Sequence, residues 1–137
     1  MEAKKLKQIL ADHKKWLKGE GGKRADLRGA YLRYADLSSA NLRKANLKGA
    51  DLERADLWGT YLEGVNLIRA DLEGADLRCA DLRNADLTDA GLCFAYLRGA
   101  NLKGADLQGV DLRCANLQGA DLRCANFMDT GLDGLEG

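Results

Sequence analysis

The carboxylates that could act together in this 137-residue chain form two pairs, Asp51 with Glu53 and Asp71 with Glu73. The second pair repeats the first 20 positions later in the sequence. Clustered carboxylates attract a divalent cation or the Lys and Arg side chains of a partner protein. Exposed carboxylates interact only weakly in water, so an ordinary solvated surface is the simpler interpretation. The choice depends on whether the fold brings the two pairs together.

Groups that could support catalysis are few. His13 is the only histidine, and no Ser or Cys has an evident base partner. The glycines keep to fixed positions of a repeat and form no phosphate-binding loop. The spacings of the four cysteines fit no compact zinc site; they are Cys79, Cys93, Cys114 and Cys124. We therefore expect a protein that is not an enzyme, with no cofactor and no bound metal.

A five-residue repeat determines where each of these side chains can lie. A Leu falls at every fifth position from Leu27 to Leu132, except at Phe127, which makes 22 consecutive units. The residue two before the central one is Ala in 18 units, and the residue just before it is Asp or Asn in 17. A period of five fits neither the buried stripe of an α-helix nor one face of a continuous strand. Each unit must therefore contain its own bend.

The bent units predict an all-β solenoid. Ala and Leu, two residues apart, point inward, and each coil of chain stacks on the one before it through backbone hydrogen bonds. The absence of proline agrees with such a ladder, since proline cannot donate a backbone hydrogen bond. A Gly at the second position after many of the central Leu residues fits a turn with positive φ. The core is expected to include Leu27, Leu47, Leu77, Leu102 and Phe127.

Units such as Ala25-Asp26-Leu27-Arg28-Gly29 and Ala120-Asp121-Leu122-Arg123-Cys124 resemble those of the pentapeptide-repeat protein family. The resemblance implies a right-handed quadrilateral β-helix with four units in each coil. On that basis we expect three parts. They are a cap helix with a glycine hinge over residues 1–24, about 5.5 coils over residues 25–134, and a tail over residues 135–137.

The first coil is expected to be covered by a short N-terminal capping α-helix. Apolar residues recur at helical spacing on one stripe, with His13 at its edge and the lysines mostly outside it. The stripe consists of Leu6, Ile9, Leu10, Trp16 and Leu17. Because the basic residues give this segment a positive charge, contact with a membrane surface or a nucleic acid is the alternative use of the helix. We favour the cap, because the first coil would otherwise expose its edge.

No second helix follows the repeat, whose pattern decays after Phe127. Members of the family that it resembles often dimerise through their C-terminal ends. A symmetric pair would also cover the last coil. Either the bulkier Phe127 and the last turn close the coil, or this end packs against a second copy. We favour the second interpretation and expect a homodimer formed through the C-terminal end.

In a four-sided stack, residues 20 apart form columns. This arrangement places Asp51, Glu53, Asp71 and Glu73 on adjacent coils of one acidic side. Trp58 points outward and is a candidate for a protein contact. We take these five residues as the candidate protein-interaction surface.

Two functions follow. The favoured one is a rigid, non-enzymatic interaction module for an unknown protein partner. We expect it in the cytoplasm, because no signal-peptide core and no segment of transmembrane length is found. The alternative comes from the resemblance, since some members of the family imitate B-form DNA and modulate type II topoisomerases such as gyrase. A formal net charge of zero disfavours such mimicry. Contact with a nucleic acid through the basic helix and one basic side is a third and weaker hypothesis.

Overall fold

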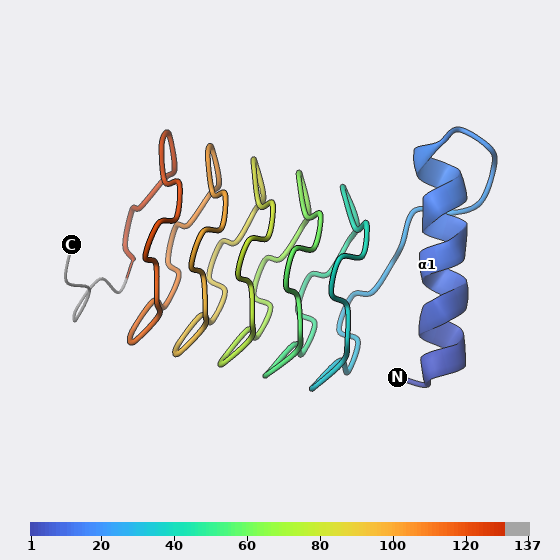
Figure 1. Cartoon of the computed structure of the whole chain (residues 1–137), viewed down its shortest axis with the longest axis horizontal. Coiled ribbons are helices and arrows are strands. Elements are labelled where there is room, and N and C mark those ends of the chain that lie inside the picture. Colours follow the sequence, from blue (N-terminus) through green and yellow to red (C-terminus); the bar gives the residue numbers. More distant parts are fainter. Residues whose placement is uncertain (131–137) are drawn as a thin grey trace.

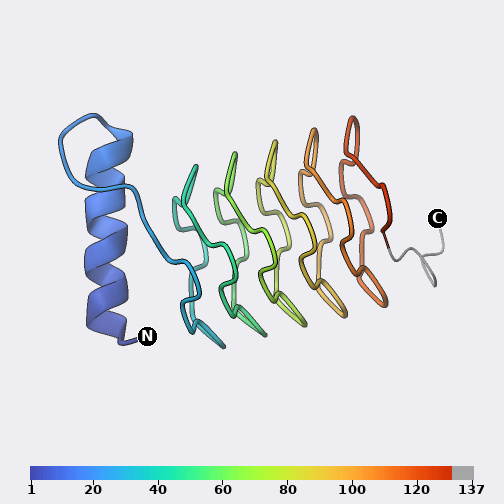
Figure 2. The ribbon, with the colours of Figure 1, turned by 180° about the vertical axis from the view of Figure 1, so that it is seen from behind.

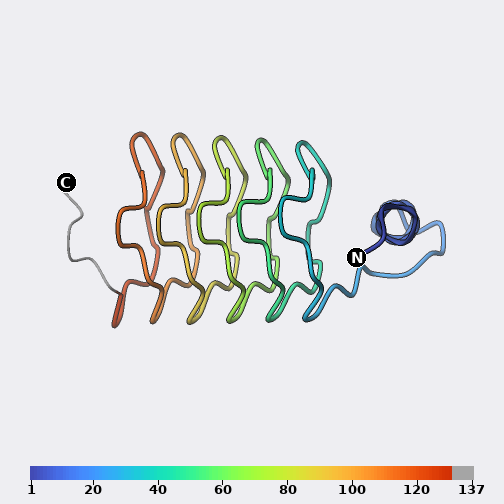
Figure 3. The same cartoon turned by 90° about the horizontal axis from the view of Figure 1, so that it is seen from below.

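The computed structural model describes residues 1–130, which form one helix followed by a stack of coils (Figure 1). Helix α1 spans Ala3–Leu17, and the first bridge of the stack is made by Asp26. α1 lies across one end of the stack, with its axis roughly perpendicular to the direction in which the coils are piled (Figures 1 and 3). The expected end of the β-helix at residue 134 and the tail at 135–137 lie outside the described residues.

Each coil contains four repeat units. Parallel bridges join the residue just before a central Leu to the residue 20 positions later, from Asp26 with Asn46 to Asp106 with Asn126. This register agrees with the four-sided coil that the resemblance implies; the right-handed winding stays an expectation of the family. The bridges are isolated, so each described side consists of one bridged residue and a turn. The coils are therefore joined by parallel β-bridges, and the described residues contain no long strands.

Backbone hydrogen bonds between coils fix the stacking. In a representative unit, the Leu77 N–H donates to the Tyr96 carbonyl at 2.7 Å and the Cys79 N–H donates to the Arg98 carbonyl at 3.1 Å. Within the unit, the Ala80 N–H closes the turn on the Leu77 carbonyl at 3.0 Å. Each unit thus satisfies its own turn and binds its neighbour in the next coil.

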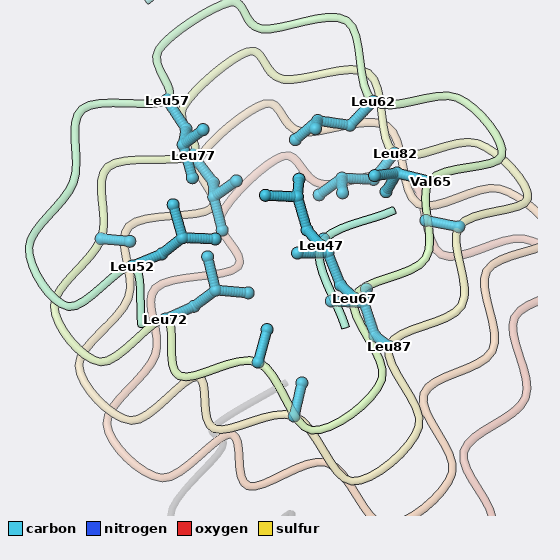
Figure 4. Close-up of a cluster of buried hydrophobic side chains, with 14 of the residues drawn as sticks. Leu47, Leu52, Leu57, Leu62, Val65, Leu67, Leu72, Leu77, Leu82 and Leu87 are labelled. Carbon is cyan, nitrogen blue, oxygen red and sulfur yellow. The ribbon is translucent and has the colours of Figure 1, made fainter. Parts of the chain in front are cut away.

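The core is a column of Leu and Ala inside the coils (Figure 4). Leu27, Leu47, Leu77 and Leu102 are all no more than 1% exposed. Burying a Leu side chain contributes roughly 1.5–3 kcal/mol, and the repeat buries its central Leu in every unit from Leu27 to Leu112. The inward Ala leaves room for these Leu side chains because it adds little volume. The interior is therefore filled, and any chemistry must take place on the outside.

The Asp or Asn before each Leu stabilises the turn that follows. In every unit that has one, from Asp26 to Asn126, the side-chain oxygen Oδ1 accepts a hydrogen bond from the backbone N–H two residues later. This is an Asx-turn, which offers the backbone a local partner at the corner. The residue after that N–H has a positive φ whether it is Gly or not, as at Gly104 (φ 71°) and Arg69 (φ 57°). The Gly preference at this position therefore reflects the left-handed conformation.

Helix α1 ends in a glycine cap. The Gly19 N–H donates to the Trp16 carbonyl at 3.1 Å and the Glu20 N–H donates to the Lys15 carbonyl at 3.0 Å, with Gly19 at φ 71°. This is the Schellman arrangement. The chain then turns back along α1 before it enters the first coil (Figure 2). Gly22, expected in a hinge, lies so close to α1 that an added Cβ would be 2.8 Å from the Lys15 Cβ. It is a close-packing glycine.

The apolar stripe of α1 faces the first coil. Leu6, Ile9 and Leu10 are partly buried against the core. Trp16 is half-buried and stacks on His13, with ring centroids 5.5 Å apart, and Leu17 is half-buried too.

His13 is completely buried, although the sequence suggested only the edge of the stripe. Its Nδ1 accepts a hydrogen bond from the Ala25 N–H at 2.9 Å, and its Nε2 lies 3.0 Å from the Arg43 carbonyl oxygen. An acceptor at Nδ1 and a carbonyl at Nε2 require the neutral tautomer with its proton on Nε2. Burial lowers the pKa of His13, which favours the same neutral form. His13 thus joins α1 to both ends of the first coil.

The C-terminal end of the stack differs. Phe127, expected in the core, is only half-buried, as are Leu117 and Leu122 of the same region. Leu102 and Leu107, one coil earlier, are 1% and 0% exposed. The reason is positional, since a core residue needs a coil on each side of it.

Candidate functional site

The predicted acidic side exists, and it has two distinct halves. In the first half, the carboxylates of Asp51 and Glu53 bind Arg33 of the preceding coil, at 2.7 Å from Nε and 3.1 Å from Nη1. The hydrogen bond from Arg33 lowers the pKa of Asp51. Oxygens of Asp51, Glu53 and Asp71 lie within 4.8 Å of one another. Arg33 carries one positive charge against the two carboxylates that it binds, so it offsets only part of the negative charge of Asp51 and Glu53.

The second half opens into a shallow hollow around Gly91. This residue occupies the position that most units fill with Asp or Asn, so one side chain is missing from the column. The hollow has a volume of about 340 Å³. Charged and polar residues line it, namely Arg69, Asp71, Glu73, Asp89, Cys93, Asp111 and Arg113. Sequence reasoning missed it, although the Gly in place of Asp was the available signal.

Three carboxylates of the hollow form no ion pair within residues 1–130, namely those of Asp71, Glu73 and Asp89. Asp111, in contrast, binds Arg113 at 2.7 Å, and this contact lowers the pKa of its carboxyl group. Burial raises the pKa of the Cys93 thiol, so Cys93 is a poor nucleophile. All four cysteines are free thiols.

Trp58 is separate from the acidic residues. It is 45% exposed and belongs to the unit of Leu57, whereas Asp51 and Glu53 flank Leu52. Leu52 and Leu57 enter the core from different sides of the coil (Figure 4). The five residues of the candidate surface therefore occupy two sides of the stack and not one.

All five Asp-Leu-Arg units contain an ion pair between their own Asp and Arg. The Arg guanidinium reaches back to the Asp two residues earlier and binds both carboxylate oxygens, which is a strong geometry for this pair. For example, Arg123 binds Asp121 at 2.7 Å and holds the pKa of that carboxyl group at about 2. The same pairing occurs at Asp26–Arg28, Asp76–Arg78, Asp81–Arg83 and Asp111–Arg113. The outer surface thus carries far less free charge than its composition suggests.

The arrangement defines a class of protein, a four-sided repeat solenoid with a filled interior and a polar outer surface. Residues 23–59, 59–92 and 92–129 each match the family model described as pentapeptide repeats (8 copies). The chain belongs to the pentapeptide-repeat family.

Solved structures of this family resemble the chain along most of its length. A pentapeptide repeat protein, Rfr23, from the cyanobacterium Cyanothece 51142 is 41% identical with a TM-score of 0.64; the match covers 70% of this chain but only 63% of that protein. One from the Arabidopsis thaliana thylakoid lumen is 36% identical with a TM-score of 0.60, covering 77% of this chain and 70% of that one.

Full-length QnrB1, a plasmid-mediated fluoroquinolone resistance protein, is 20% identical with a TM-score of 0.52. That match covers 87% of this chain and 67% of QnrB1, and it shows a shared fold alone. A comparison with curated protein sequences found no match. Among the described residues, no helix is both long and apolar enough to cross a membrane.

Proposed function

We propose that the protein is a non-enzymatic interaction module that binds a protein partner through the hollow at Gly91 and the acidic residues beside it. Asp71 and Glu73 provide two of its free carboxylates and Asp89 a third, and Asp51 and Glu53 extend the acidic side toward the N-terminus. The observation that carries the proposal is that Asp71, Glu73 and Asp89 have no ion pair among residues 1–130 and line a hollow. A Lys or Arg side chain of the partner fits such a site.

The rigidity of the scaffold supports this use. The backbone of each coil is bonded to the next, and the Leu column is filled, so the surface is held in one shape before binding. A preorganised surface binds without the entropy cost of ordering itself. Trp58, on the neighbouring side, provides a second and independent contact point.

The test is capture of binding proteins with paired variants. Asp71→Asn together with Glu73→Gln removes two of the three free charges of the hollow, while the Asn can still accept the Asx-turn hydrogen bond. The matched control is Asp56→Asn together with Asp86→Asn, which removes two charges on other sides and also keeps the turns. A partner that is lost with the first pair and kept with the second supports the proposal. A partner insensitive to both pairs contradicts the proposed site.

The DNA-mimic alternative is less favoured. The fold shared with QnrB1 gives it a scaffold, but the Asp–Arg pairs on this chain neutralise carboxylates that a phosphate mimic would need to display. A gyrase supercoiling assay with purified protein, with and without a quinolone, separates the two functions. Inhibition or protection would favour mimicry, and no effect at tens of micromolar would leave the interaction module.

We also propose a homodimer through the C-terminal end. The half-buried state of Leu117, Leu122 and Phe127 supports it, because their counterparts in earlier coils are covered completely. Analytical ultracentrifugation is the test, and a monomer at high micromolar concentration would exclude the dimer. The cytoplasm stays a prediction, since one relative comes from a thylakoid lumen.

A further inference from the structure

The contact between α1 and the first coil is incomplete and leaves a groove of about 750 Å³. His13 fixes one part of the helix to Ala25 and Arg43. Nearer the N-terminus of α1, the groove is bounded by helix residues on one side and by the segment from Tyr31 to Asp36 on the other. Its apolar lining includes Leu6, Leu10 and Leu32.

The coil edge that faces this groove has unused hydrogen-bonding groups. One coil later, the Asp56 N–H donates to the Ala35 carbonyl at 2.9 Å, and the Asp56 carbonyl accepts from the Leu37 N–H at 2.8 Å. Asp36 occupies the same place in the first coil. Its N–H and carbonyl have no hydrogen-bond partner among residues 1–130, and neither has the Arg33 carbonyl. The ladder is therefore open at Asp36, and a further extended segment would complete it.

The charges beside the groove favour an acidic occupant. Lys4 and Lys7 line it, and neither forms an ion pair within the described chain. Arg33 also lines it but is bound to Asp51 and Glu53. Asp36 is the one acidic side chain of the lining. Its Oδ1 accepts a hydrogen bond from the Ser38 hydroxyl at 2.6 Å. The free charge of the groove is thus positive.

We propose that this groove binds an extended acidic peptide of a partner protein, which adds a strand to the edge of the first coil at Asp36. The peptide forms the same two backbone hydrogen bonds with Asp36 that residues 35–37 form with Asp56. One of its carbonyls accepts from the Asp36 N–H, and an N–H two residues later donates to the Asp36 carbonyl. The side chain of that donating residue occupies the inward position of a central Leu, against Leu6 and Leu10. Acidic residues on either side meet Lys4 and Lys7.

The same geometry argues against the two other uses of a basic helix, contact with a membrane surface and contact with a nucleic acid. The apolar stripe of α1 already faces the coil, so it is not available to a lipid surface. A nucleic acid would contact lysines all along α1 and would need neither the apolar lining nor the open edge. The site is distinct from the hollow at Gly91, which lies farther along the stack, so either can fail without the other.

The test uses a fluorescein-labelled peptide of sequence Glu-Glu-Ala-Asp-Leu-Glu-Glu, titrated with the full chain and followed by anisotropy. We expect saturable binding in the range of tens to hundreds of micromolar, typical of a short strand. The same peptide with N-methyl-leucine lacks the N–H that bonds to the Asp36 carbonyl, and it should bind at least about tenfold more weakly. Equal binding of both peptides, or no saturable binding of the parent, would overturn the proposal.

Two matched pairs of variants locate the site on the protein. Lys4→Glu together with Lys7→Glu reverses the charges in the groove, and Lys5→Glu together with Lys15→Glu makes the same change in net charge outside it. Ala3→Trp fills this groove, and Ala11→Trp fills the one on the other flank of α1. All six positions are exposed, so the fold is retained.

We expect the affinity for the peptide to fall about tenfold or more with the Lys4/Lys7 double variant and with Ala3→Trp. It should fall less than about threefold with the Lys5/Lys15 double variant and with Ala11→Trp. Equal losses within the charge pair would mean diffuse attraction to α1, as for a nucleic acid, and would contradict strand addition.

Discussion

The two ends of the stack meet the same physical problem and treat it differently. At the N-terminal end, His13 supplies a hydrogen bond to Ala25 and one to Arg43, and α1 lays Leu6 and Leu10 over the core. At the C-terminal end, the last described units keep the five-residue pattern but leave Leu122 and Phe127 half-buried. A solenoid coil is stabilised by its neighbours, so a terminal coil is weaker unless something else covers it.

The difference shows what a cap must provide. The interior coils need only the repeat, because each one supplies both the apolar surface and the hydrogen bonds that the next one requires. At the first coil, the apolar stripe of α1 replaces the apolar surface of a preceding coil, and the buried imidazole of His13 replaces some of its hydrogen bonds. Its cover is still partial, which leaves the groove at Asp36.

The largest effect is expected from a charge in the middle of the core. Leu77→Asp buries a carboxylate with no partner and should lower the free energy of unfolding by more than about 4 kcal/mol. Leu122→Asp, at a half-buried position of the last coil, should cost roughly half as much or less. Urea denaturation followed by circular dichroism measures both. Arg78→Ala is the control, and its loss should stay under about 1 kcal/mol because the Arg78–Asp76 pair is on the surface. Equal effects of the two Asp variants would remove the distinction between middle and end.

The next effect concerns the cap. His13→Ala leaves the Ala25 N–H and the Arg43 carbonyl without their partner and should destabilise the docking of α1 by about 2–4 kcal/mol. Hydrogen exchange should show lost protection in α1 and the first coil, with the middle coils unchanged. Gln8→Ala, on the exposed side of α1, should leave the exchange pattern as it is. Uniform loss of protection along the stack would instead show that the cap and the coils unfold as one unit.

Turn substitutions should have the same effect at both ends. Gly29 and Gly119 have φ of 61° and 72°, and a Cβ added at either position meets no close atom. Gly29→Ala and Gly119→Ala should therefore each cost about 1 kcal/mol, from the left-handed backbone alone. Arg69→Gly makes the reverse change at a position that already has a positive φ, so it should raise stability by up to about 1 kcal/mol. Thermal unfolding measures all three, and a much larger cost at the capped end would indicate a hidden contact there.

The smallest effect is a pH dependence confined to the capped end. Burial lowers the pKa of His13 from its ordinary value of 6.5. A lowered pKa means that the unfolded state binds the proton more readily. The stability from docking is therefore complete above pH 6.5 and is lost as the pH falls below it, toward the folded-state pKa. Hydrogen exchange of α1 between pH 7.5 and 5 should show this loss, and His13→Gln should abolish it. The Asp carboxyls held by Arg titrate far below this window. A capped end whose stability rises on acidification would contradict the neutral tautomer.

Most of the fold was predictable because the same five-residue pattern recurs in 22 consecutive units. The inward positions of Leu47, Leu77 and Leu102 and the left-handed turn followed from the five-residue period and from glycine frequency. Phe127 did not behave like them, since its neighbour on one side is not another full coil within the described residues. Local pattern cannot report how many coils cover a residue.

The candidate site was predictable only in part. The columns of Asp51 with Asp71 and of Glu53 with Glu73 followed once four units were assigned to each coil. The partners of these residues did not follow. Arg33 binds Asp51 and Glu53, and Gly91 opens a hollow beside Asp71 and Glu73. The local sequence does not report either contact, because each involves a residue one coil away. Trp58 was grouped with them by exposure, but the coil places it on another side.

The sequence by itself determined the architecture, since a period of five with Ala and Leu at fixed positions has few ways to bury its apolar residues. It also determined the corner chemistry, because the Asp or Asn of a unit acts on a backbone N–H only two residues away. The tertiary structure alone decided which charges remain free, where the surface is hollow, and how α1 is held. Those properties depend on residues brought together from different coils, and on one buried imidazole whose two partners lie 12 and 30 positions along the chain.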